Sequence, residues 1–419
     1  MVPSPPVAPE RHSGLESEPA PGRALLFAAA CGGIASVSFA PAIHANFLSA
    51  LSRDFGLDNA GSSLYLSLNF WGALFAVIVA GPAAGRLGSR PLLVGAWILE
   101  LVAVAAIGLA PLPVVAYAGV LAASLAFGTI TVLMPHLVSS LYPERRTQAL
   151  SLLVSFFTIG AVVSNTLVLA LFALGASWRT GYLAASALAL PWGVLLAASR
   201  GPLFHQPARA RRPSPPVGHP GDTAGLRTAL LLFAAICVAQ MAGSAAEVST
   251  SMWVPTFLVR EAGAPPFYGP ISLLLFCVGG ALGKLCNAWA VHRVDERVLL
   301  STGTAFFVGG LLLASLSSGA GAALAGFSLA GLGTGGFMPA VTVRMANSFP
   351  SASPSRYSLF MAVGNLGPIG GPVLIGMAAA GDLRKGMLTM LPAALACFVL
   401  LLATRSGGTR AAKASGTSA

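Results

Sequence analysis

The chain alternates between long apolar stretches and short polar turns. A helix that crosses a bilayer needs about 20 predominantly apolar residues. Six stretches near that length lie in each half of the chain, at 24–50, 62–82, 92–110, 114–138, 148–173 and 180–199, and then at 228–259, 268–291, 298–317, 321–345, 357–380 and 386–404. The pattern therefore predicts an all-α integral membrane protein with twelve transmembrane helices.

Three polar segments divide this pattern. Residues 1–22 are rich in proline and lack the apolar core of a secretory signal, so we expect a disordered cytoplasmic tail. Residues 200–226 are basic and rich in proline, which predicts a flexible cytoplasmic linker. We expect one six-helix bundle at 23–199, a second at 227–404, and a second cytoplasmic tail at 405–419.

The two halves repeat each other at a constant offset. Arg86 and Arg293, Pro143 and Pro350, and Gly160 and Gly367 are each 207 positions apart (293 − 86, 350 − 143, 367 − 160). Because each half has six spans, the second half begins on the same side of the membrane as the first. The repeats are then parallel, related by an axis along the membrane normal.

Composition and charge agree with a membrane protein. Mean hydropathy is +0.79 and 9% of residues are charged, against about 25% in soluble proteins. With both termini in the cytoplasm, 17 of the 24 lysines and arginines lie on the cytoplasmic side, 5 lie outside and 2 lie within spans. This bias predicts a multi-pass protein of the cell inner (plasma) membrane, and it explains the net charge of +11 without a nucleic-acid partner.

The loop GPAAGRLGSR at 81–90 carries a family signature. It resembles the loop after the second span of the major facilitator superfamily, and departs from it at Gly85, where the family has an acid. The resemblance covers about residues 23–404 and implies two bundles that rock around a central site. It assigns gating roles to loop positions of both halves, to which we add Glu100 as a packing or gating residue; the candidates are Gly81, Arg86, Gly88, Arg90, Arg293, Arg297 and Glu100.

The second half resembles one group within that family. The segments AGSAAEVSTSMW (242–253), GALGKLCNAWAVHR (280–293) and GGFMPAVTVRMANSFP (335–350) are similar to the fucose-permease-like sugar symporters. The matched positions are Glu247, Trp253, Gly283 and Lys284, where a lysine stands for the group's arginine. The group's acids in the first and fourth spans are absent, and His44 and His136 stand in those spans instead.

Glu247 is the only charged residue between Arg227 and Arg260. A carboxylate in the bilayer centre costs roughly 2.5–3.5 kcal/mol, so a functional role is the first hypothesis. It could bind a proton or a substrate hydroxyl, and the polar residues three and four positions away predict one polar stripe on its helix. The alternative is a structural ion pair with Lys284 or Arg344. Counting along the helices places Glu247 about 30 Å and Lys284 about 14 Å above the inner face, which argues against that pair.

Other polar residues on cavity-lining spans complete the candidate set. Lys284 could attract an anionic substrate or extend to the cytoplasmic surface, and asparagines could bond sugar hydroxyls or join helices. The candidates for substrate or proton binding are Glu247, Lys284, His44, Gln240, Trp253, Asn46 and Asn365.

The sequence favours a secondary active transporter that works by alternating access. We expect proton-coupled uptake of a sugar or polyol-like compound. The alternative is proton-driven efflux of a drug, natural product or organic anion. An intramembrane enzyme using His44, His136 or Glu247 fits the two-fold repeat less well, and nothing in the sequence requires a non-transporting sensor.

No cofactor or metal site is expected. GLGTGG (331–336) resembles a nucleotide motif but lies inside an apolar span without a preceding strand, and GGALGK (279–284) has one residue too few for a phosphate loop and is followed by Leu285. GNLGPIGGPVLIG (364–376) indicates close helix packing or a hinge. The partners are a small-molecule substrate, protons and the lipid bilayer, and we expect a monomer.

Overall fold

The computed structural model describes residues 20–142, 146–199, 223–290, 293–349, 354–379 and 381–404. This part of the chain consists of helices that are joined by short turns. The predicted tails at 1–19 and 405–419 and the linker core at 200–222 lie outside the described residues, as do the turn prolines Pro143 and Pro350.

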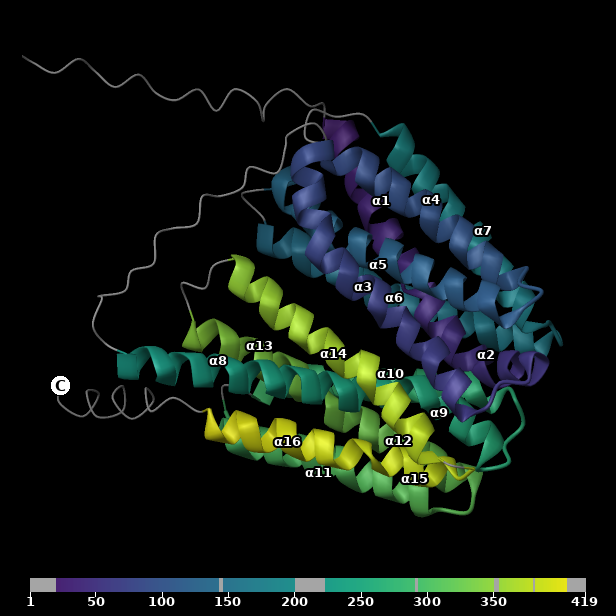
Figure 1. Cartoon of the computed structure of the whole chain (residues 1–419), viewed down its shortest axis with the longest axis vertical. Coiled ribbons are helices and arrows are strands. Elements are labelled where there is room, and N and C mark those ends of the chain that lie inside the picture. The colour runs from purple at the N-terminus through teal and green to yellow at the C-terminus, as the bar shows by residue number, and fades with distance from the viewer. Residues whose placement is uncertain are drawn as a thin grey trace, which may run out of the picture.

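Among the described residues, the first half contains seven α-helices and the second half contains nine, which are labelled in Figure 1. Those of the first half are α1 (Ala20–Val37), α2 (Phe39–Phe55), α3 (Asn59–Leu87), α4 (Ser89–Gly108), α5 (Pro113–Leu141), α6 (Arg146–Ala173) and α7 (Trp178–Ala198). Those of the second are α8 (Thr223–Ser244), α9 (Thr250–Arg260), α10 (Tyr268–Ala290), α11 (Glu296–Leu316), α12 (Ala320–Thr334), α13 (Phe337–Ser348), α14 (Pro354–Ala379), α15 (Leu383–Leu388) and α16 (Met390–Ala403). A single π turn, η2 (Ala245–Ser249), joins α8 to α9.

These helices correspond to the twelve predicted spans. Four spans are divided by a local irregularity, namely α1–α2, α8–η2–α9, α12–α13 and α15–α16. Eleven segments of the described residues are long and apolar enough to cross a membrane, and α6 adds a shorter apolar stretch at Ile159–Ala173. Large apolar side chains are exposed along many of the helices, as expected for surfaces that face lipid. The prediction of an all-α, multi-pass fold is confirmed.

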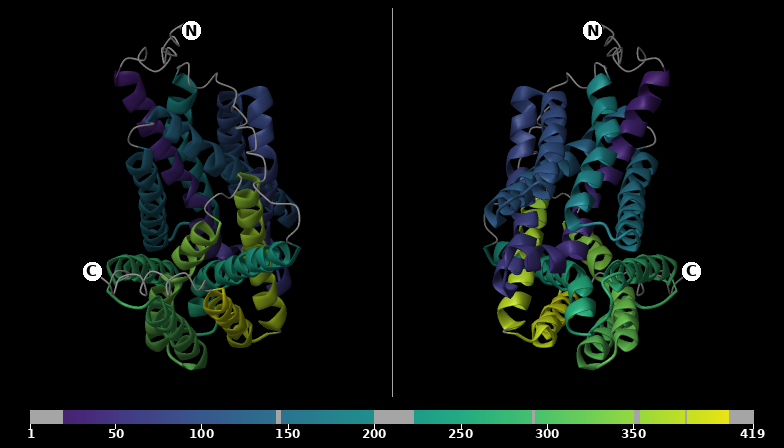
Figure 2. Two further views of the ribbon diagram at one scale, coloured as in Figure 1. Left: turned by 90° about the vertical axis from the view of Figure 1, so that its left-hand side faces the viewer. Right: turned by 90° about the vertical axis from the view of Figure 1, so that its right-hand side faces the viewer.

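The two groups of helices form separate bundles that are steeply inclined to each other (Figures 1 and 2). At one end of the molecule α1 and α8 begin and α7 and α16 stop. We call it the linker end, because the segment 200–222 joins α7 to α8 there. The opposite end, where α2 and α9 stop, is the far end. In Figure 1 the bundles meet near α2 and α9 and diverge toward the linker end.

Contacts between the bundles involve α2, α3 and α6 of the first bundle, and α6 packs against α10. α3 packs against α14, and α2 packs against α9. The Ser67 hydroxyl donates a hydrogen bond to the Ile369 carbonyl at 2.7 Å, and Arg260 Nη1 lies 3.4 Å from Asn59 Oδ1. Gly376 of α14 touches Ser63 so closely that a Cβ atom there would overlap its hydroxyl. The far end is therefore closed in this structure.

Glycines explain the motifs that resemble nucleotide loops. Gly279 and Gly283 of α10 lie against the backbone of α12, and Gly331 of α12 lies against the Phe276 carbonyl. Gly335 meets the backbone of Gly283 and Lys284. The two motifs therefore pack against each other, since only glycine allows backbones to approach this closely.

The glycine-rich segment of α14 serves the same purpose. Gly364 packs on the Gln240 side chain, Gly367 on the Met241 carbonyl and Gly371 on Ser249. These contacts confirm the packing role expected for residues 364–376, and they hold α14 against α8 and η2.

Candidate functional site

Glu247 lies in the π turn η2, in the middle of the span formed by α8, η2 and α9. A π turn is a single wide turn inside an α-helix, and such turns are frequent at functional sites. The turn is held by close packing against α14, where Gly367 and Gly371 leave room for its backbone and for Ser249. Its position in the fold is therefore determined by the neighbouring helix.

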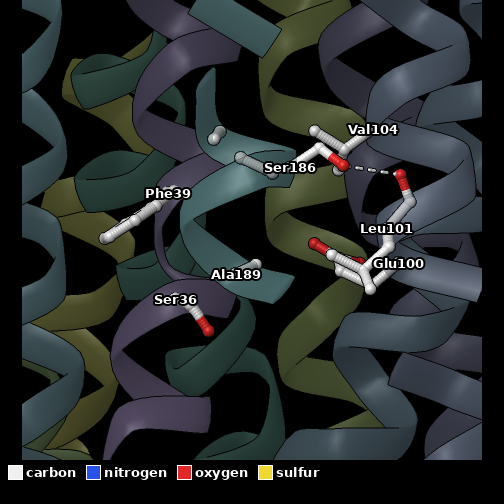
Figure 3. A pocket seen from close by; sticks show the side chains of 9 residues that line it. Ser36, Phe39, Glu100, Leu101, Val104, Ser186 and Ala189 are labelled. Carbon is white, nitrogen blue, oxygen red and sulfur yellow. Dashed lines mark hydrogen bonds between the residues drawn. The ribbon is translucent and has the colours of Figure 1, made fainter. Parts of the chain in front are cut away.

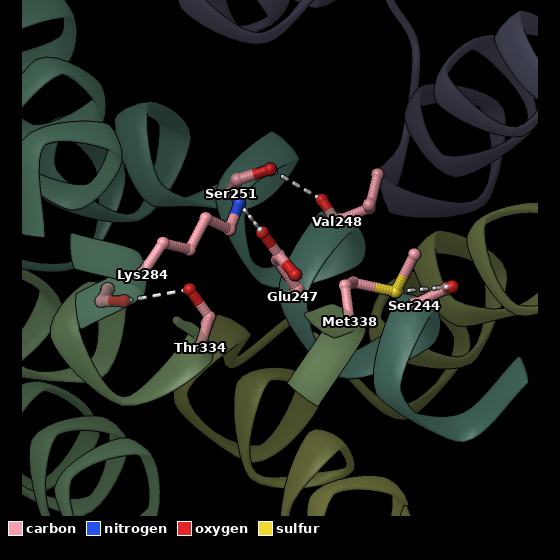
Figure 4. Close-up of polar contacts among 8 residues, drawn as sticks. Ser244, Glu247, Val248, Ser251, Lys284, Thr334 and Met338 are labelled. Carbon is pink, nitrogen blue, oxygen red and sulfur yellow. Dashed lines mark hydrogen bonds and ion pairs between the residues drawn. The ribbon is translucent and has the colours of Figure 1, made fainter. Parts of the chain in front are cut away.

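The structure pairs Glu247 with Lys284 of α10 (Figure 4). Lys284 Nζ donates to Glu247 Oε1 at 3.2 Å, and the two side chains are 47% and 17% exposed. The second carboxylate oxygen, Oε2, is buried and has no hydrogen-bond partner. The carboxylate is thus paired on one side and desolvated on the other.

The expectation that Glu247 and Lys284 lie too far apart to pair is wrong. It treated residue count along each helix as depth in the membrane. The beginning of α8 extends beyond the neighbouring helix ends (Figure 1), so counting from Arg227 overestimates the depth of Glu247. The lysine side chain also spans several ångströms of the remaining separation.

The single polar stripe predicted for this span is also not observed. Gln240 packs against Gly364 of α14, whereas Gly243 faces Phe337 and Cys397. The Ser244 hydroxyl lies 3.4 Å from Met338 Sδ on α13. These three positions all precede the π turn, in α8, and they contact α13, α14 and α16 and not one common surface.

Several polar atoms of this span are nevertheless buried without a protein partner. The Trp253 side chain is fully buried, so the structure places it in packing and not on an open surface. The orphaned atoms are Gln240 Oε1, Glu247 Oε2, Ser249 Oγ, Thr250 Oγ1, Trp253 Nε1 and Thr256 Oγ1. Buried polar atoms ordinarily have a partner, and their concentration around Glu247 marks this span as the polar centre of the second bundle.

His44 and Asn46 face the interior of the first bundle. His44 Nδ1 lies 2.7 Å from Tyr182 Oη and 3.1 Å from Tyr65 Oη, and the two tyrosine oxygens are 2.7 Å apart. Asn46 Nδ2 donates to Asn165 Oδ1 at 2.9 Å and joins α2 to α6. The structure does not bring either residue to Glu247. Asn365 is partly buried on α14, and His136 is exposed on α5.

The two tyrosines are functional-site neighbours that the sequence reasoning missed. Tyr65 and Tyr182 are 21 and 138 residues away from His44, so no local spacing reveals the cluster. Tyr182 lies in the segment WRTGYL at 178–183, which carries no sign of a histidine partner.

Replacing Tyr182 with phenylalanine tests whether this cluster is structural. The change removes hydrogen bonds to His44 and Tyr65 and leaves buried polar atoms unpaired, which costs about 1–3 kcal/mol. We expect a lower melting temperature with unchanged proton coupling. A variant of normal stability that loses gradient-driven transport would instead assign the cluster to the transport cycle.

The predicted gating residues other than Glu100 lie at the linker end of each bundle. Gly88 has φ +85° between α3 and α4, a conformation that favours glycine. Arg90 Nη2 donates to the Ala197 carbonyl at 2.9 Å, and Arg293 stacks 4.1 Å from the Trp289 ring. Gly81 and Arg86 are exposed on α3, and Arg297 is exposed in the first turn of α11. In these contacts each set stays within its own bundle.

Glu100 lies inside the first bundle, between α1, α2 and α7 (Figure 3). It is 4% exposed, and it borders a cavity of about 10 Å³ together with Ser36 and Ser186, which is close to the least that holds one water. Its Oε2 has no protein partner. Glu100 is a buried carboxyl remote from the pair on η2 and α10, which agrees with a packing or gating role without testing it.

Two inclined bundles of long apolar helices define a multi-pass membrane protein. The chain belongs to the Major Facilitator Superfamily, whose sequence profile matches residues 25–294 and 270–418. It is therefore a transporter and not an enzyme. A relative described as an uncharacterized MFS-type transporter of Yersinia pestis is 26% identical over 166 residues, which span 40% of this chain and 41% of the relative.

Solved transporters share the fold at low sequence identity. A bacterial homolog of the human lysosomal transporter Spinster, in an inward-facing and occupied conformation, has a TM-score of 0.74 at 14% identity, covering 92% of this chain and 97% of its own. The D323A mutant of the nucleoside transporter NupG has a TM-score of 0.71 at 16% identity, covering 91% and 100%. A D-xylose-proton symporter has a TM-score of 0.71 at 13% identity, covering 91% and 96%.

Proposed function

We propose that this transporter couples the uptake of a small polar solute, of the sugar or polyol class, to protons, with the Glu247–Lys284 pair as the coupling element. The observation that carries the proposal is the half-paired carboxylate, with Oε1 on Lys284 Nζ at 3.2 Å and Oε2 buried without a partner. Oε2 is therefore the atom that has no protein partner and that a proton or a substrate hydroxyl could bond.

The pair gives a simple coupling cycle. A proton that binds Glu247 Oε2 neutralises the carboxylate and weakens its hold on the Lys284 ammonium. The protonated carboxyl can then donate to a substrate oxygen, and Lys284 can donate to another. Release of the proton and substrate restores the pair. Each ligand thereby changes the affinity for the other, which is the thermodynamic requirement for coupling.

Orientation and conformation follow from charge and contacts. The excess of lysine and arginine on the linker side supports a cytoplasmic linker end and cytoplasmic termini in the inner membrane. With the far end closed by Ser67–Ile369 and by α2 against α9, the structure is an inward-facing conformation under this assignment. The two bundles then act as the two rigid bodies of alternating access.

The sugar class rests on sequence. The segments 242–253, 280–293 and 335–350 resemble the fucose-permease-like symporters, and the orphaned polar atoms beside Glu247 provide donors and acceptors for hydroxyl groups. Asn365, partly buried on α14, is a further candidate contact. The similarity to a D-xylose-proton symporter is one of fold.

Thermal stabilisation of the purified protein tests the substrate class. The panel contains neutral sugars and polyols, organic anions and lipophilic drugs. A ligand at 100 times its Kd stabilises the folded state by about 2.7 kcal/mol. We expect a shift with at least one sugar or polyol, followed by pH-gradient-driven uptake of that compound into proteoliposomes. A shift restricted to lipophilic drugs would overturn the sugar assignment.

A second candidate function has one observation in its favour. Nearly half of the Lys284 side chain is exposed although its charge is paired, so an organic anion could compete with Glu247 for the ammonium. Proton-driven efflux of such an anion, or of a drug or natural product, is then the alternative. This alternative predicts that organic carboxylates raise the melting temperature of the wild type but not of Lys284→Met. It also predicts that proton entry drives the anion out of the cell and not into it.

A double-mutant cycle measures the pair itself. Lys284→Met leaves the partly buried Glu247 carboxylate unpaired, and we expect it to lower the melting temperature more than the combined Glu247→Gln/Lys284→Met change does. The coupling free energy should be about 1 kcal/mol, because lysine is largely exposed and interhelical polar pairs are worth about this much. Additive effects of the two changes would mean that the pair does not form in the membrane.

A further inference from the structure

Five cations among the described residues lie at the far end, and three of them have partners within their own bundle. Arg179 lies over the Trp178 ring at 4.3 Å and donates to the Ala110 carbonyl at 3.2 Å. Arg384 Nη1 donates to the Ser317 carbonyl at 2.6 Å, and Lys385 lies 3.9 Å from Asp382. Each of these contacts stays within one bundle.

The other two, Arg53 and Arg260, face one another across the contact between the bundles. They line a pocket of about 460 Å³ between the ends of α2 and α9. Arg260 has one hydrogen bond, a 3.4 Å contact with Asn59 Oδ1, and Arg53 has no side-chain partner among the described residues. The two positions are equivalent in the repeats, since 260 − 53 is also 207.

Nearby carboxylates are engaged elsewhere. Asp54 Oδ2 accepts from Trp178 Nε1 at 2.7 Å, and Asp58 Oδ1 accepts from the Gly61 amide at the start of α3 at 2.7 Å. Glu261 Oε1 accepts from the Leu383 amide at 3.0 Å. None of these three residues lines the pocket, so its charged lining is positive.

The same pocket offers a hydroxyl donor. Ser49 Oγ is buried without a partner, and Ser52 lies on the same wall, where its hydroxyl bonds Ser62. Two guanidinium groups and a hydroxyl match the oxygens of a tetrahedral oxyanion, for which arginine is the preferred ligand. Without an anion, closing the far end brings two like charges together, which opposes closure.

We propose that this pocket binds a phosphate group, which bridges Arg53 and Arg260 and stabilises the conformation that is closed at the far end. The site lies apart from Glu247 and Lys284, so it is a regulatory site and not the substrate site. It exists only when the bundles meet at the far end, because each bundle supplies one arginine. The phosphate group comes from solution or from a lipid headgroup, and both sources satisfy the same chemistry.

The test titrates the purified full-length protein in detergent at constant ionic strength. Inorganic phosphate replaces chloride in one arm, and phosphatidylglycerol replaces a zwitterionic lipid in the other. The readouts are melting temperature and a spin-label distance between Ala60 and Phe267, both exposed at the far end. We expect phosphate or phosphatidylglycerol to raise the melting temperature and to increase the population with the short distance.

The variants decide the assignment. Arg53→Gln should weaken the response about tenfold or more, because it removes a charge-assisted contact, whereas Lys385→Gln removes a far-end charge outside the pocket and should respond normally. Arg53→Glu supplies the missing anion itself and should give the short distance without any added phosphate. A response confined to phosphatidylglycerol identifies a lipid headgroup. No response in either arm, or equal responses in wild type and Arg53→Gln, would overturn the site, and neither result bears on coupling at Glu247.

Discussion

Replacing Glu247 with glutamine is expected to abolish accumulation driven by a pH gradient while preserving exchange of substrate across the membrane. Glutamine keeps the size and hydrogen-bonding capacity of the side chain but cannot bind and release a proton. With one proton per substrate, a gradient of one pH unit supports about tenfold accumulation. The variant should reach a concentration ratio of one, measured in proteoliposomes with an imposed gradient, and should retain counterflow.

Glu100→Gln is the matched control for this experiment. Glu100 is also a buried carboxyl with one unpartnered oxygen, but it lies inside the first bundle without a lysine partner among the residues that line its cavity. We expect Glu100→Gln to accumulate substrate as the wild type does. Normal accumulation by Glu247→Gln would remove Glu247 from coupling, and loss of coupling in Glu100→Gln alone would transfer that role to the first bundle.

Replacing Gly376 with alanine is expected to shift the conformational equilibrium toward opening at the far end. The added Cβ would overlap the Ser63 hydroxyl and lie 2.7 Å from the Asn59 carbonyl across the bundle contact. Overpacking of this kind costs about 1–3 kcal/mol, which corresponds to a change of about 5–150-fold in the equilibrium. Because the clash exists only when the bundles meet, the far-end-closed conformation bears the whole cost.

The measurement is the distribution of spin-label distances between Ala60 and Phe267, which should move to longer values in Gly376→Ala. Two glycines of the same helix serve as controls. A methyl group at Gly370 would meet no atom within 4 Å, so Gly370→Ala should change nothing. Gly367 packs on α8 inside the second bundle, so Gly367→Ala should lower stability without a shift in distance. Unchanged distances in Gly376→Ala would show that α3 and α14 do not close the far end.

The spans and their number could be predicted from the sequence because the bilayer leaves few alternatives. A stretch of about 20 apolar residues must form a helix, since no water is present to bond a free backbone. The residues that interrupt helices were harder to foresee. α1 ends before Ser38, and α12 ends before Gly335 and Gly336. None of these residues interrupts the apolar pattern, because the irregularities follow from packing between helices.

The candidate site was predicted in part. Glu247 could be singled out because an isolated acid in an apolar run is costly, but its partner could not, since that contact depends on how α8 and α10 tilt. His44 shows the opposite limitation. A histidine on the first span resembles a cavity residue in sequence, and only the fold reveals that Tyr65 and Tyr182 surround it.

The π turn that carries Glu247 also has a consequence for the history of the chain. Before the turn, FAAAC at 27–31 and FAAIC at 233–237 are offset by 206 positions (233 − 27), whereas Arg53 and Arg260 are offset by 207. One residue was therefore gained by the second copy, or lost by the first, between these two points, which lie within a single membrane span. A π turn accommodates one additional residue without disturbing the helix on either side. We infer that a one-residue insertion after duplication of the repeat produced η2, and so gave this span a site for an acid where the equivalent positions of the first bundle are Ala40 and Pro41.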